Sequence, residues 1–192
     1  MEITRREAVR RLTVLLGSAA SASTVTALLS GCETPASTPD WAPAALSSEQ
    51  VDLLGIVVDR ILPRTETPGA VEAGVPRFID LMLERWAEPE ERERFLTGLD
   101  GLDLLMRGAE GTTFRVAGAE AQSALLSRLD QEAVQAREDE VDPLPFFAIL
   151  KEWTLAGYYT SETGATRELQ WLPMPGRYDG DVALEEVGRS WA

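Results

Sequence analysis

Residues 47–69 read SSEQVDLLGIVVDRILPRTETPG, and this stretch decides the fold. Ser47 and Gln50 have the spacing of a capping box, in which each side chain accepts a hydrogen bond from the backbone of the other residue. Apolar residues then recur at spacings of three and four, the period of one helix face: Val51, Leu54, Val58, Ile61 and Leu62. Two prolines and a glycine between residues 63 and 69 stop the helix. We therefore expect a helix over residues 47–62, followed by a polar loop.

Four further segments repeat the helical spacing of apolar residues. The second helix is expected to begin near Pro76, because proline is tolerated in the first turn of a helix. The third is expected to begin near Pro89, where acidic residues follow in the first turn. The fourth covers residues 119–136 and the fifth residues 146–159. The sequence thus predicts an all-α protein, with about five helices in one domain over residues 47–159.

The helical period disappears after Thr160. Residues 160–192 scatter glycines and prolines among three aromatic residues, Trp171, Tyr178 and Trp191. So long a segment without regular structure is unusual in a compact domain, yet this one is too aromatic to be simply disordered. We expect a long irregular arm that wraps a partner, with these aromatic residues in the interface.

The composition excludes several classes of function. The formal net charge of −14 over 192 residues disfavours nucleic-acid binding, because such a surface repels phosphate. The chain has no histidine, and its one cysteine, Cys32, leaves no partner for an intrachain disulfide or a cysteine-ligated metal site. We expect no catalytic, cofactor-binding or metal-binding residues in this chain. A hydrolase built from two carboxylates is the alternative that these residues leave open.

The first 31 residues have the order of an export signal: a basic start, an apolar run and a cleavage region. Arg5 and Arg6 follow Thr4 in a pattern that resembles a twin-arginine signal, although the residues after them depart from its usual form. That route exports folded proteins. The signal therefore predicts that this chain travels together with a partner that already holds its cofactor.

A lipobox follows, in the order Leu29-Ser30-Gly31-Cys32, which predicts cleavage before Cys32 and a lipid on its thiol. The alternative is that residues 12–31 stay as a membrane helix, since about 20 apolar residues span a bilayer. Residues 32–46, rich in Pro, Ala, Ser and Thr, are expected to form a tether. We therefore expect an exported protein in the periplasm or another extracytoplasmic space, anchored to a membrane by its lipid.

Two blocks of the sequence resemble one known family. The first block is Ile61-Leu62-Pro63-Arg64-Thr65-Glu66-Thr67-Pro68-Gly69-Ala70, followed by Gly74-Val75-Pro76. The second is Gly157-Tyr158-Tyr159-Thr160-Ser161, followed by Gly164 and by Pro175-Gly176-Arg177-Tyr178. Together, and in this order, they resemble the gluconate 2-dehydrogenase subunit 3 family. The resemblance extends from about residue 46 to residue 192.

This resemblance implies a non-catalytic small subunit of a flavoprotein dehydrogenase complex. In that family the large subunit binds FAD and oxidises a sugar or sugar acid, and electrons commonly leave through a cytochrome c subunit or a similar carrier. The small subunit often holds the export signal and supports maturation of the large one. FAD is therefore expected in the partner, and no cofactor in this chain. A freestanding structural lipoprotein is the alternative.

Two segments form the predicted partner interface. One is the polar loop, whose restricted backbone suits presentation to a partner; its residues are Arg64, Thr65, Thr67, Pro68 and Gly69. The other interpretation of this loop is that it only connects two helices. The second segment is the tail; its residues are Trp171, Pro175, Gly176, Tyr178 and Trp191.

Overall fold

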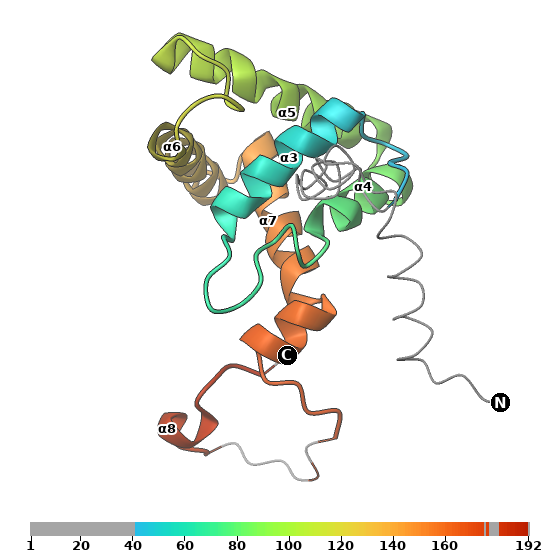
Figure 1. The fold of residues 1–192 in the computed structure, drawn as a ribbon, viewed down its shortest axis with the longest axis vertical. Coiled ribbons are helices and arrows are strands. Elements are labelled where there is room, and N and C mark those ends of the chain that lie inside the picture. The colour runs from blue at the N-terminus through green and yellow to red at the C-terminus, as the bar shows by residue number, and fades with distance from the viewer. Residues whose placement is uncertain (1–40, 175, 177–180, 192) are drawn as a thin grey trace, which may run out of the picture. The chain divides into compact units, whose positions relative to one another are not determined.

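A computed structural model describes residues 41–174, residue 176 and residues 181–191 of the chain (Figure 1). The chain divides into two units, Met1–Ala42 and Pro43–Ala192, and the second contains the helices described below. Five long helices follow one another: α3 (Ser48–Ile61), α4 (Val75–Arg85), α5 (Pro89–Glu110), α6 (Ala119–Glu138) and α7 (Phe146–Tyr159). A π-helix, η2 (Gly164–Glu168), and a short α8 (Leu184–Val187) come after them. The predicted all-α fold with about five main helices is confirmed.

The start of α3 contains the predicted capping box. The Gln50 amide donates to Ser47 Oγ over 3.2 Å, and the Ser47 amide donates to Gln50 Oε1 over 3.0 Å. These two bonds satisfy amides that a helix start otherwise leaves without a partner. The sequence pattern and the local structure therefore agree at the point where the fold begins.

Helix α7 forms the centre of the helical body. It packs against each of α3, α4, α5 and α6 (Figure 1). Its sequence, FFAILKEWTLAGYY, is apolar on nearly every side, as expected for a helix that other helices surround. The Phe95 ring of α5 meets two of its rings, edge-on to Phe146 at 5.3 Å and stacked on Trp153 at 5.4 Å. Phe95 is fully buried, so this aromatic group is part of the core.

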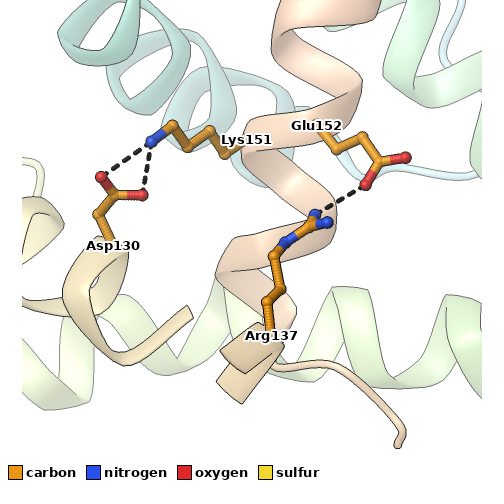
Figure 2. Close-up of polar contacts among 4 residues, drawn as sticks. All are labelled: Asp130, Arg137, Lys151 and Glu152. Atoms are coloured by element: carbon orange, nitrogen blue, oxygen red, sulfur yellow. Dashed lines mark hydrogen bonds and ion pairs between the residues drawn. The ribbon is translucent and has the colours of Figure 1, made fainter. Parts of the chain in front are cut away.

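Two ion pairs join α6 to α7 at the edge of this core (Figure 2). Lys151, the one lysine of the chain, donates to both carboxylate oxygens of Asp130 over 2.7 and 2.8 Å. Arg137 donates to Glu152 over 2.8 Å. Because all four side chains are partly exposed, solvent screens the pairs. They therefore contribute more to the orientation of α6 against α7 than to the stability of the fold.

A buried carboxylate fixes the point at which the chain enters the helical body. Asp80, on α4, accepts hydrogen bonds from the amides of Ala44, Ala45 and Leu46 over 3.0, 2.9 and 3.0 Å. Leu46 is itself buried. The last three residues of the predicted tether are thus part of the folded unit.

The predicted export and anchoring residues Arg5, Arg6 and Cys32 lie outside the described part of the chain, as does the alternative membrane helix over residues 12–31. Among the helices that the structure describes, none is both long and apolar enough to cross a membrane.

Candidate functional site at the base of the C-terminal arm

The two sequence blocks that lie far apart in the chain meet in space. We define the signature loop as residues 62–70, between α3 and α4. The arm is the described part of the chain after η2, which is residues 169–174, 176 and 181–191. The loop is closed at its base by a hydrogen bond from the Ala70 amide to the Leu62 carbonyl, 2.9 Å long. A Cβ atom at Gly69 would lie 2.8 Å from the Arg64 nitrogen and 2.8 Å from Asp59 Oδ1, so only glycine fits there.

Two hydrogen bonds connect the signature loop to the end of α7 and to η2, and we call them the loop–arm junction. The Thr67 hydroxyl donates to Glu168 Oε2 over 2.7 Å, and the Tyr158 hydroxyl donates to the Pro68 carbonyl over 2.9 Å. Tyr158 is buried, and a buried phenol that had no partner would be costly. The junction therefore holds the loop against the residues that precede the arm.

The turn between α7 and η2 depends on close backbone contact. Ser161 Oγ donates to the Tyr158 carbonyl over 2.6 Å and accepts from the Gly164 amide over 3.0 Å. A Cβ atom at Gly164 would lie 2.0 Å from the Tyr158 oxygen, a clash that no side chain could relieve. Because single π-helical turns are frequent at functional sites, η2 marks the segment that follows it as a candidate site.

The arm leaves η2 and returns to it (Figure 1). The Gln170 amide donates to the Ser190 carbonyl over 2.8 Å, and Gln170 forms an isolated parallel bridge with Trp191. The Gln170 side chain also donates to the carbonyls of Val187 and Arg189. The arm is irregular, as predicted, but its two ends are joined and it contains the short helix α8.

Four large apolar side chains of the arm face solvent, and we call them the arm patch. Their exposed fractions are 61% for Trp171, 47% for Leu172, 81% for Met174 and 54% for Trp191. Trp171 and Leu172 are adjacent in the chain, and the bridge between Gln170 and Trp191 brings Trp191 to the same end of the arm. Exposed apolar side chains gathered in this way commonly mark a binding site. The arm patch is the part of this site that is available to another molecule.

The residues of the predicted interface fall into three groups. Arg64 and Thr65 are exposed, and Arg64 forms an ion pair with Glu72. Thr67 and Pro68 are partly buried in the junction, and Gly69 is buried. In the tail, Trp171, Gly176 and Trp191 are exposed, whereas Pro175 and Tyr178 lie outside the described residues. The structure thus separates the loop residues that contact the chain itself from those that face solvent.

Sequence reasoning missed Glu168, Leu172 and Met174. Glu168 lies 101 residues from Thr67, and no local pattern could have paired them. Leu172 and Met174 flank Pro173 directly after Trp171. Two prolines within three residues, Pro173 and Pro175, disfavour a helix here, and this signal could have identified Leu172 and Met174 as part of the same exposed patch.

The described residues contain no group of three or more acidic, histidine or cysteine side chains placed to hold a metal ion. A hollow of about 580 Å³ lies between α4 and the first half of α5, and another of about 560 Å³ lies between the end of α5 and α6. Neither is lined by residues of the junction or of the arm. The base of the arm itself presents an exposed apolar surface, which the arm patch forms.

The comparisons with known proteins give one result. The family model described as gluconate 2-dehydrogenase subunit 3 matches residues 48–176, which include α3 to α7, η2 and the beginning of the arm. No curated protein and no solved structure matches the chain significantly. The matched region is more than half of the 192 residues and contains both halves of the loop–arm junction. The chain belongs to the gluconate 2-dehydrogenase subunit 3 family.

Proposed function

We propose that this chain is the non-catalytic small subunit of an exported flavoprotein dehydrogenase that oxidises a sugar or sugar acid. Membership of the family makes it a subunit of a dehydrogenase complex. The observation that carries the finer proposal is the arm patch, since four large apolar side chains exposed on one arm favour contact with a larger protein.

The polar groups in the interior support an accessory role. Asp80, Gln122 and Thr154 are the buried polar residues of the described chain, and each is used to hold the fold together. Asp80 binds three amides, and Gln122 accepts from Arg60 and donates to the Phe114 carbonyl. Thr154 donates to the Leu150 carbonyl of its own helix. Catalytic groups are usually poised in a pocket toward a substrate, whereas these are engaged with the chain itself.

In this proposal the chemistry belongs to the partner. The large subunit binds FAD and oxidises the substrate, and a cytochrome c subunit or a similar carrier accepts the electrons. The small chain contributes export through Arg5 and Arg6, anchoring through a lipid on Cys32, and support for maturation of the large subunit. The sequence patterns at residues 1–32 support the roles in export and anchoring, and the role in maturation rests on the family resemblance.

The test is to capture the tagged full chain from its native membranes and to record the absorption spectrum of the eluate. We expect a larger protein to elute with it, with flavin absorption near about 450 nm. Reduction of a dye by that eluate, with a series of sugars and sugar acids, then identifies the substrate. The Cys32→Ser variant is the matched control for anchoring, and we expect it to capture the same flavoprotein from the soluble fraction.

A chain that elutes alone, colourless and monodisperse, contradicts this proposal. The freestanding structural lipoprotein would then be the better account, with the arm closed on itself for its own stability. Turnover by the isolated chain would instead support the hydrolase alternative.

A further inference from the structure

The loop–arm junction and the arm patch lie on one short piece of chain. Glu168 belongs to the junction and Trp171 to the patch, and they are only three residues apart. Trp191, at the other end of the arm, is held beside Gln170 by the backbone bridge. The junction therefore anchors the chain three residues before Trp171, and the bridge brings Trp191 to the same end of the arm.

We infer that the junction presets the direction of the arm, so that the arm patch enters an apolar recess on the flavoprotein large subunit. This inference rests on the proposed function and refines it. Thr67 and Pro68 are then positioning residues that act within the chain, and the residues of the arm patch are those that contact the partner.

The energetic argument is one of preorganisation. A free arm would lose backbone and side-chain entropy when it docks, and this loss weakens binding. The hydrogen bond between Thr67 and Glu168 joins a hydroxyl to a carboxylate that carries charge, a type that is stronger than a neutral pair. Both side chains are partly shielded from water. The junction can therefore order the base of the arm before the partner arrives.

The charge distribution favours a different protein, and not a second copy of this chain, as the binding partner of the arm patch. Four acidic and four basic residues precede residue 43, so the folded unit keeps the formal net charge of −14. Glu185 and Glu186 of α8 lie exposed on the arm itself. Two copies would repel each other at this surface, whereas an apolar recess with a basic rim would complement it.

The experiment measures how fast the flavoprotein dissociates from the full tagged chain, captured as a complex from native membranes. We expect Trp171→Ala combined with Trp191→Ala to raise the dissociation rate at least about thirtyfold, since buried aromatic anchors dominate interfaces. Thr67→Val keeps the shape of the side chain and removes its hydroxyl, and we expect an increase of about tenfold. Thr67→Ser keeps the hydroxyl and should behave like the natural chain. Trp86→Ala removes an exposed tryptophan of the helical body and is the control for general loss of apolar surface.

A second measurement separates positioning from simple stability. In the free chain, Thr67→Val should speed tryptic cleavage after Arg167 or Arg189, with the midpoint of thermal unfolding unchanged, and Thr67→Ser should restore the slow cleavage. If Thr67→Val lowers that midpoint and leaves dissociation unchanged, the junction is only structural and the inference is wrong. If the flavoprotein is captured but neither variant alters its dissociation, the inference fails and the proposed function stands. If no flavoprotein is captured, both fail.

Discussion

The helical body and the arm differ in how far they bury their large apolar side chains. In α3 to α7 many large apolar residues meet in a core around α7, while others such as Leu104 stay exposed. The buried residues Asp80, Gln122 and Thr154 have partners within the chain. In the arm, described over residues 169–174, 176 and 181–191, four large apolar side chains face solvent, and backbone contacts at its two ends give it shape. The body thus buries apolar residues that stabilise the fold, whereas the arm leaves four of its large apolar side chains exposed.

This difference directs the search for a binding surface to the exposed arm, beside the residues of the two motif blocks. Both motif blocks contribute to the boundary between the two regions, where Thr67 of the first block meets Glu168 and Tyr158 of the second block meets Pro68. The motif residues therefore connect a stable body to an exposed arm. Substitutions on either side of that boundary should have effects of very different size on folding.

The largest effect is expected from Phe95→Ala in the core. The ring is fully buried against Phe146 and Trp153, and truncation leaves a cavity that the surrounding helices can fill only in part. We expect a loss of about 3–5 kcal/mol in the free energy of unfolding, measured by urea denaturation. Leu104→Ala, an exposed position on the same helix, is the matched control and should cost far less. Equal losses at the two positions would contradict the core described for α5.

An intermediate effect is expected from Asp80→Asn at the entry of the chain. The amide keeps one acceptor oxygen but loses the charge and presents a donor to backbone amides that are themselves donors. We expect a loss of about 2 kcal/mol in the free energy of unfolding, together with faster hydrogen exchange at residues 44–46. Asp52→Asn, an exposed carboxylate on α3, provides the comparison. Unchanged exchange at these three amides would rule out the role given to Asp80.

The smallest effect on folding is expected from Trp171→Ala in the arm. Because 61% of this side chain is exposed, its removal should change the free energy of unfolding by less than about 0.5 kcal/mol. Circular dichroism during thermal unfolding is a sufficient measurement. A large loss of stability would mean that the arm belongs to the cooperative unit of the body, and the contrast between the two regions would disappear.

Local patterns were sufficient to predict much of the fold, because their causes are local. The capping box of Ser47 and Gln50 joins residues three apart, and the apolar stripe of α3 repeats every three or four residues. The end of α5 has no such local signal, since the helix continues past its last buried residue, Met106, to Glu110. Solvated turns of that kind leave no apolar pattern.

The contacts of the candidate site could not be predicted in the same way. Asp80 binds amides that lie 34 to 36 residues earlier in the sequence, and Glu168 binds a hydroxyl 101 residues away. Single acidic residues on helices are common, and only the packing of α3, α4 and α7 decides which of them meets a partner. The sequence did indicate the signature loop and the tryptophans of the arm, and their role as an interface stays a prediction.

Asp80 has a further consequence for how the molecule would respond to tension. A pull on the chain from before Pro43 reaches α3 only after the hydrogen bonds of residues 44–46 to one carboxylate have broken. Bonds that must break together resist more force than bonds that open one after another, as they do at a fraying helix end. The force would be transmitted through Asp80 to α4, where Ile79 and Leu83 are fully buried in the core. Under such a pull, α3 would keep its helical structure, because the packed helix α4 bears the force.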